Sequence, residues 1–301
     1  MYQLFSVLTG LILAVMIAIN GHLSEQYGVF TAAMIIHIVG VIFAFCLCLL
    51  RREKYRLPAR VPLWIYSGGV IGVITTVCNN LSFGHISMTS ILALGLFGQM
   101  ITALCIDSLG LLGMKKHPFR KASLAGFLFA VIGIGIMLDS SVTAAAYAVL
   151  FSLAAGVSVV LSRTVNAHLS QQIGALQGSL INHLAGLPVT VIIVLLTAPG
   201  HLVPAPAASL PAWIYLGGAF GVVTVLLCNI TVPKVSAFRL TVLTFIGQFF
   251  TGICLDLFAG KNHSDTSFAG GIIIALGIAL NMAIEYPDSR KSAGCMDKQT
   301  Q

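Results

Sequence analysis

Ten apolar stretches occupy most of this 301-residue chain, and each is about as long as a helix that crosses a membrane. Such a helix needs about 20 consecutive apolar residues. The stretches are 3–21, 30–50, 63–82, 87–108, 122–139, 145–162, 174–197, 212–230, 236–258 and 266–284. Because lipid offers backbone groups no hydrogen-bond partner, and because the runs are continuous, we expect helices and not the alternating strands of a barrel.

The composition supports an integral membrane protein. Charged residues make up 8% of the chain, whereas soluble domains carry about 25%. No Lys or Arg precedes the first apolar run, which we therefore expect to be a spanning helix and not a cleaved signal. The seven cysteines contain no CxxC pair, so neither a disulfide framework nor a zinc site is expected.

The chain contains an internal duplication. AINGHLS at 18–24 returns as TVNAHLS at 164–170, and Asn166 follows Asn20 by 146 positions. The same offset relates His37 to His183. Further pairs follow in the same order: WIYSGGVIG (64–72) with WIYLGGAFG (213–221), Asn80 with Asn229, and GQMITALCID (98–107) with GQFFTGICLD (247–256). Collinear self-similarity of this kind is typical of a repeated structural unit.

Each half holds five predicted helices, and because five is odd the second half should enter the membrane in the opposite orientation. Lys and Arg gather in loops 51–62 and 109–121, and Arg163, Lys234 and the C-terminal segment fall on the same side. Such residues favour the cytoplasmic side. We therefore predict an all-α protein of ten transmembrane helices in two inverted repeats, 1–142 and 143–286, with both termini and the tail 287–301 in the cytoplasm.

The net charge of +7 is thus an orientation signal. No basic stripe with interleaved aromatic residues is present, so no nucleic-acid partner is expected.

Polar side chains inside apolar helices are costly and usually face a cavity or a partner helix. As candidates for substrate binding we take the repeat-paired amides and hydroxyls, together with one cation that has no counterpart. The alternative role for the paired residues is packing between helices. The alternative for the cation is a side chain that extends along the helix so that its charge reaches the membrane interface. These candidates are Asn20, Asn166, Asn80, Asn229, Gln99, Gln248, Thr102, Thr251 and Arg239.

Two further pairs are candidates for proton coupling. His37 and His183 lie in the second helix of each half, and histidine titrates near neutral pH. Asp107 and Asp256 lie near the ends of the fourth helices. A hydrogen bond to a neighbouring helix is the alternative for the histidines, and an interfacial tether between helices is the alternative for the carboxylates.

The ordered motifs resemble those of a known family. AxNGHLS and VNAHLS, GGVIG and GGAFG, and GQxxxxxxxD in both halves are similar to the YdcZ-like inner-membrane exporters of the drug/metabolite transporter superfamily, in their fused two-repeat form. The resemblance spans about 1–284 and implies the drug/metabolite transporter fold and a bacterial plasma-membrane exporter. The second half departs from it, because DLFAGKNHS (256–264) replaces the DSLGLLG ending. The first-helix Glu that small multidrug exporters use for cations is also missing, so a hydrophobic cation is a less expected substrate.

We therefore expect a secondary active transporter, a proton-coupled exporter of a small metabolite or drug-like solute that works by alternating access. The expected partners are this solute and the lipid bilayer. No P-loop is present, and no cofactor or metal is expected. A flippase for a lipid-linked solute is the alternative. An intramembrane enzyme is less expected, because neither an HExxH motif nor a nucleophile–base set occurs. The fused repeats favour a functional monomer, and a dimer is the alternative.

Overall fold

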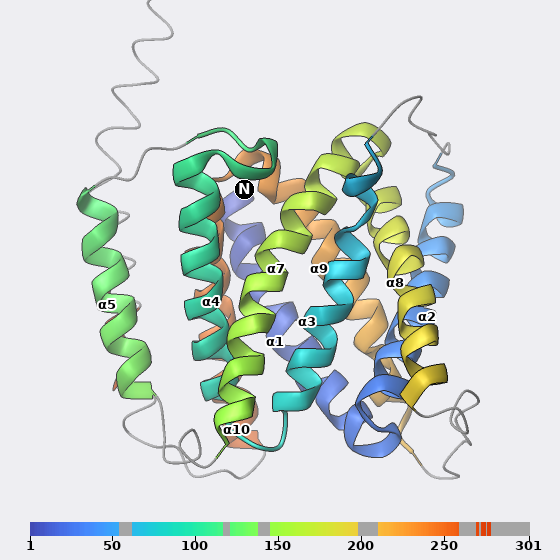
Figure 1. Cartoon of the computed structure of the whole chain (residues 1–301), viewed down its shortest axis with the longest axis horizontal. Coiled ribbons are helices and arrows are strands. Elements are labelled where there is room, and N and C mark those ends of the chain that lie inside the picture. Colours follow the sequence, from blue (N-terminus) through green and yellow to red (C-terminus); the bar gives the residue numbers. More distant parts are fainter. Residues whose placement is uncertain are drawn as a thin grey trace, which may run out of the picture.

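A computed structural model describes residues 1–53, 62–116, 121–137, 145–197, 210–258, 269–270, 272–274 and 276–277. The described elements are helices, and no strand occurs among them (Figure 1). The α-helices are α1 (Tyr2–Tyr27), α2 (Val29–Leu50), α3 (Gly68–Ser82), α4 (Met88–Leu109), α5 (Lys121–Met137), α7 (Ala146–Ile173), α8 (Ala175–Thr197), α9 (Gly217–Thr231) and α10 (Ala237–Phe258). Short 3-10 helices are η1 (Leu63–Tyr66), η2 (Leu111–Gly113), η4 (Ala212–Leu216) and η5 (Val232–Lys234).

The prediction of an all-helical, multi-pass chain is confirmed. Seven of the described segments are long and apolar enough to cross a membrane. α3 is shorter and is preceded directly by η1, and the apolar part of α5 is also short. The predicted tenth segment lies mostly, and the tail 287–301 entirely, outside the described residues, so the count of ten remains a prediction.

Two predicted helix ends are wrong. α1 continues past residue 21 to Tyr27, and α7 continues past residue 162 to Ile173. Each stops at the next residue that takes positive φ, Gly28 at +79° and Gly174 at +100°. Glycine adopts positive φ without steric cost and so permits the chain to leave the helix there, whereas the polar phrases before it are compatible with helix. Both repeated phrases therefore lie inside helices.

The two halves of the chain interlock. α1 packs on α9 and α10, α7 packs on α3 and α4, and α2 packs on α8. Glycines allow the backbones to approach closely, as is common between membrane helices. A Cβ on Gly10 of α1 would lie 1.8 Å from the Thr244 carbonyl oxygen of α10, and one on Gly156 of α7 would lie 2.1 Å from the Gly95 oxygen of α4. The first helix of each half therefore depends on the fourth helix of the other.

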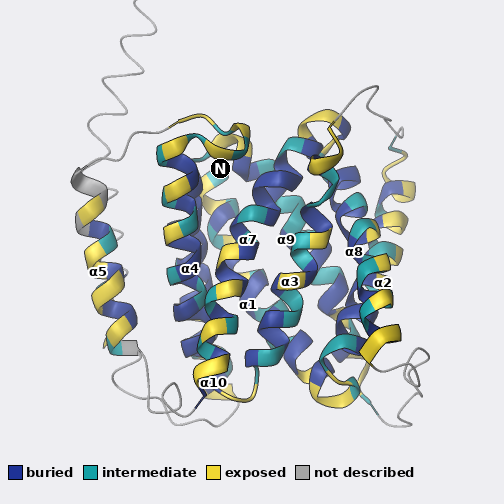
Figure 2. Cartoon of the chain, viewed as in Figure 1, coloured by how far each residue is buried: buried dark blue, intermediate teal, exposed yellow. Residues whose placement is uncertain are grey.

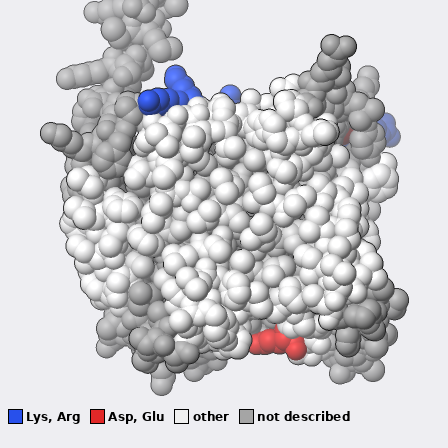
Figure 3. All heavy atoms as spheres, viewed as in Figure 1, with Lys and Arg blue, Asp and Glu red and all other residues white. Residues whose placement is uncertain are grey.

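The outer surface is apolar. Exposed residues lie mainly on the outward faces of the helices in Figure 2, and they include large side chains such as Ile42, Leu196 and Phe258. Among the described residues visible in Figure 3, Lys and Arg lie near the end that carries the N-terminus, and the main acidic patch lies at the opposite edge. This surface is suited to contact with lipid tails.

Candidate functional site

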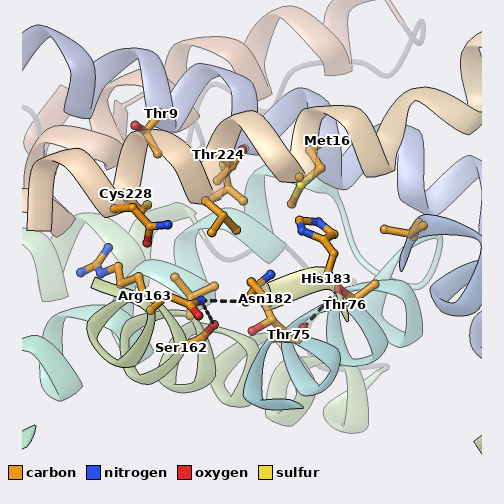
Figure 4. Close-up of a pocket in the computed structure, with 18 of the residues that line it drawn as sticks. Thr9, Met16, Thr75, Thr76, Ser162, Arg163, Asn182, His183, Thr224 and Cys228 are labelled. Atoms are coloured by element: carbon orange, nitrogen blue, oxygen red, sulfur yellow. Dashed lines mark hydrogen bonds between the residues drawn. The ribbon is translucent and has the colours of Figure 1, made fainter. Parts of the chain in front are cut away.

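A cavity of about 110 Å³ lies between helices of both halves. α1, α2 and α3 contribute from the first half, and α7, α8, α9 and α10 from the second (Figure 4). Its wall is rich in buried polar groups although the surrounding helices are apolar. The polar side chains are those of Thr9, Asn20, His37, Thr75, Thr76, Ser162, Arg163, Asn166, Asn182, His183, Thr224, Asn229 and Thr244.

The predicted histidine pair meets in this cavity. The rings of His37 and His183 are 5.9 Å apart, centre to centre, and both side chains are buried. Each Nδ1 lies within hydrogen-bond distance of the carbonyl one turn earlier, that of Ala33 at 2.8 Å and that of Ser179 at 2.9 Å. Because a carbonyl only accepts, Nδ1 carries the proton and Nε2 of the neutral ring keeps a lone pair.

The histidines are also seated in gaps of the opposite half. A Cβ on Gly186 would lie 2.4 Å from His37 Nε2, and a Cβ on Gly40 would lie 2.1 Å from His183 Cδ2. Each imidazole thus fills the space left by a glycine in the other second helix. The pair forms a reciprocal contact between α2 and α8.

The two equivalent asparagines have different surroundings. Asn166 Nδ2 donates to Asn182 Oδ1 at 2.7 Å and to Ser162 Oγ at 3.3 Å. In the first half Ile36 and Met16 stand at the positions equivalent to Asn182 and Ser162. Among the described residues the Asn20 side chain has no hydrogen-bond partner, and its buried Oδ1 is unsatisfied. Asn20 lines the cavity, and its Oδ1 lies against Gly217, where an added Cβ would be 1.8 Å away.

Asn80 and Asn229, in the third helix of each half, hydrogen-bond to the backbone at the start of the second helix of the same half. Asn229 Nδ2 donates to the Ala175 carbonyl at 2.9 Å, and Asn80 Nδ2 donates to the equivalent Val29 carbonyl at 3.5 Å. Asn229 lines the cavity and its buried Oδ1 has no partner in the described part of the chain. Asn80 is not among the residues that line this cavity.

Arg163 is the main residue that the sequence analysis misplaced. It was predicted in a cytoplasmic loop, but it lies inside α7, is 5% exposed and lines the cavity. Its guanidinium donates to Thr241 Oγ1, to the Ala237 carbonyl oxygen at 3.2 Å and to Gln99 Oε1 at 3.5 Å. Ile17 stands at the equivalent position of the first half, so this cation breaks the repeat.

The predicted glutamines lie beside the main cavity and not in it. Gln99 and Gln248 line a smaller neighbouring cavity of about 20 Å³ between α1, α4, α7 and α10. Through its bond from Arg163, Gln99 is connected to the main cavity wall.

Three other predicted residues lie away from both cavities. Thr102 Oγ1 donates to the Gly98 carbonyl of its own helix at 2.8 Å, and Thr251 is half-buried in α10. Arg239 is half-buried in the first turn of α10, and its buried Nε has no partner among the described residues.

The two aspartates connect the ends of α4 and α10. Asp107, at the end of α4, accepts from the first backbone N–H groups of α10, those of Ala237 at 3.0 Å and Phe238 at 2.8 Å. Asp256, at the end of α10, accepts from the Thr89 hydroxyl at the start of α4. A carboxylate at a helix N-terminus satisfies free donors and complements the helix dipole. Neither aspartate is among the residues that line the cavity.

We expect the Thr89→Val substitution to destabilise the protein, because the buried Asp256 carboxylate would lose its donor. The cost should be about 1–3 kcal/mol. The unfolding midpoint of purified protein in detergent measures it. Thr102→Val is the matched control, since its hydroxyl bonds only within α4. Equal shifts for both variants would contradict the tether between α4 and α10.

A comparison with family models identifies the chain. The model described as "Putative inner membrane exporter, YdcZ" matches residues 1–136 and 147–281. The chain belongs to the YdcZ family. Two matched segments cover nearly the whole length, as expected for a two-repeat form. Together with the apolar helices, this membership makes the chain a multi-pass inner-membrane protein of an exporter family and not of an enzyme family.

Structure comparison supports the fold alone. A solved structure described only as a crystal structure of a protein covers 94% of this chain and 96% of its own, with a TM-score of 0.63 and 15% sequence identity. No curated protein matches the sequence. The substrate of this YdcZ-family chain has to be inferred from the cavity.

Proposed function

We propose that this chain is a secondary active transporter that moves a small metabolite by alternating access. The observation that carries the proposal is the cavity between the two halves, which is lined by His37 and Asn20 and by their equivalents His183 and Asn166. Residues of both repeats around one site are the usual arrangement in such transporters. The cavity volume of about 110 Å³ favours a small metabolite over a drug-like solute, whose sites are typically about 300–1,000 Å³.

The proposed architecture is ten helices in two inverted five-helix repeats, 1–142 and 143–286. The contacts between the halves come in equivalent pairs. His37 of the first half packs on Gly186 of the second, and His183 of the second half packs on Gly40 of the first. The close approach of α1 to α10 at Gly10 is likewise equivalent to that of α7 to α4 at Gly156. The cationic edge near the N-terminus favours N-in orientation (Figure 3). A cysteine-labelling map of both ends tests this, with Glu25 and Lys115 positions expected on opposite sides.

Two equivalent sets of contacts give the protein a means to switch. If one half takes the conformation of the other, the contacts exchange and the cavity opens to the opposite side. The fused repeats supply both halves in one chain, so the proposed functional unit is a monomer. Crosslinking that traps a dimer, with transport lost on dilution, would contradict this.

We propose proton coupling through the histidine pair. At a ring separation of 5.9 Å two imidazolium charges would repel, and Arg163 adds a third positive charge to the lining of the same cavity. The pair therefore holds one proton more readily than two, and the presence of a substrate can alter that preference.

We expect His37→Gln and His183→Gln each to remove the dependence of transport on a proton gradient. Gln keeps a similar length and hydrogen-bonding groups but does not take up a proton near neutral pH. His85→Gln is the matched control, because His85 is exposed and packs on Tyr147 away from the cavity. The measurement is solute accumulation in proteoliposomes with and without a pH difference. Gradient-driven accumulation that persists in both cavity variants would contradict the proposal.

The transport function itself is tested with pools of labelled anionic, cationic, zwitterionic and neutral metabolites. Counterflow into proteoliposomes above that of protein-free vesicles is the expected result, independent of lipid species. Inside-out vesicles then test direction, and accumulation in them is expected for an exporter. Movement of lipid-linked solutes alone would overturn the proposal in favour of a flippase.

A further inference from the structure

The charged wall of the cavity limits what it can bind. Arg163 is the one permanently charged side chain among the described residues that line the cavity, and no Asp or Glu lines it. We infer that the solute is a small organic anion whose carboxylate or phosphate group binds Arg163 and whose hydroxyl or amino group binds Asn20 and Asn229. This rests on the proposed function, because the cavity is taken to be the transport site.

The position of Arg163 explains why an anion is favoured. A buried cation is costly unless it has compensating partners. Its hydrogen bonds within the described part of the chain are to neutral acceptors, and they use one hydrogen of Nη1 and two of Nη2. Nε–H and the second Nη1 hydrogen make no hydrogen bond within the described part of the chain. A carboxylate or phosphate oxygen can accept from either of these charged donors.

Asp107 does not take the place of this anion. It interacts favourably with the Arg163 charge, but it lies outside the cavity wall. Its two oxygens accept from the backbone N–H groups of Ala237 and Phe238. The carboxylate thus holds the start of α10 from outside the cavity wall, and Arg163 itself is among the residues that line the cavity.

Three polar atoms of residues that line the cavity are buried and have no partner in the described part of the chain. The Asn229 amide is oriented by its bond to the Ala175 carbonyl, which leaves Oδ1 as a buried acceptor without a partner among the described residues. Asn20 Oδ1 and Thr224 Oγ1 are likewise buried and unsatisfied. An anion with only acceptor atoms would leave these amide oxygens unpaired, whereas a hydroxyl or amino group would satisfy them.

The volume of the cavity and its apolar residues narrow the chemical class of the solute further. A volume of about 110 Å³ corresponds to roughly ten water-sized groups. Leu13, Met16 and Ile36 are the large apolar side chains that the first half contributes to the wall. In Figure 4 Arg163 and Met16 lie toward opposite ends of the view. A hydroxy- or amino-carboxylate with a short aliphatic chain has the matching distribution of charge, donor and apolar surface.

The test is binding to the purified full-length protein in detergent, measured by calorimetry. The probes are lactate and 2-hydroxyisovalerate, each paired with its neutral amide, and inorganic phosphate. We expect saturable binding of the carboxylates and at least tenfold weaker binding of the amides, which corresponds to about one charge-assisted hydrogen bond. Phosphate binding above that of the carboxylates would assign the anion as a phosphate group. Equal binding of each acid and its amide, or no binding of any probe, would overturn the inference.

Variants locate the anion. Arg163→Gln should abolish carboxylate binding, and Arg163→Lys should retain preference for the acid over the amide with weaker affinity. Lys115→Gln removes the same charge at an exposed position and should bind like the native protein. Carboxylate binding that survives in folded Arg163→Gln would overturn the inference. If that variant does not fold, the acid–amide comparison on the native protein decides.

Transport measured in parallel separates this inference from the proposed function. Counterflow of a cationic or neutral metabolite, without any binding of the anion probes, would overturn the anion inference and leave the transporter intact. Arg163-dependent anion binding with no counterflow of any bound probe or pooled metabolite would support the anion site and overturn the transport function.

Discussion

Substitution of Gly156 by valine is expected to prevent the two halves from packing and to give the largest loss of folded protein of any single change considered. A Cβ at this position would lie 2.1 Å from the Gly95 carbonyl oxygen and 3.0 Å from the Gln99 backbone nitrogen. Both are backbone atoms of α4, which cannot rotate away as a side chain can. Overpacking a core usually costs about 1–3 kcal/mol. Here two helices must separate, so we expect a cost above that range.

Size-exclusion chromatography of detergent-extracted protein and the unfolding midpoint measure this effect. Gly135→Val is the matched control: Gly135 lies exposed in α5, and a Cβ there would meet nothing within 4 Å. The intrinsic cost of valine in a helix is common to both variants. The difference between their unfolding midpoints therefore measures the effect on the contact between α7 and α4. A monodisperse Gly156→Val protein with the midpoint of the control would show that α7 and α4 do not cross so closely.

The Asp107→Leu substitution is expected to give the second largest loss of stability. Leu has no acceptor, and it would leave the N–H groups of Ala237 and Phe238 without their partner at a position that is 4% exposed. An unsatisfied buried donor costs about 1–3 kcal/mol, and the charge at the start of α10 is lost as well. We expect a total of about 3 kcal/mol or more, measured as a shift of the unfolding midpoint.

The Asp107→Asn substitution separates the two interpretations of this residue. Asn keeps one acceptor oxygen, so a tether predicts an intermediate loss of stability and unchanged dependence of transport on the proton gradient. If Asp107 is instead a proton site, Asp107→Asn should have near-native stability, and its transport should no longer depend on the proton gradient. Lys116→Gln, an exposed change in the same region, controls for the change of net charge.

The sequence determined most of the described helices. Lipid forces long apolar runs to form helices, since no other structure except a closed barrel satisfies the backbone, and the predicted segments at 30–50 and 236–258 agree closely with α2 and α10. The duplication paired equivalent positions, although the two asparagines of the pair Asn20 and Asn166 have different surroundings. His37 and His183 are the clearest pair: the same offset that pairs them in sequence places both in one cavity.

Only the tertiary structure decided which polar residues face that cavity. A helical pattern defines the faces of one helix but not which neighbour each face meets, and α1 and α7 pack against helices of the opposite half. Gln99 and Gln248 therefore lie in the smaller cavity, and Asp107 serves α10. The charge pattern placed Arg163 in a loop because cations are rare inside membranes. The sequence signal for Arg163 was the break in the repeat, because Ile17 stands at the equivalent position of the first half. In the structure α7 continues through residue 163, and the guanidinium donates to acceptors of α4 and α10.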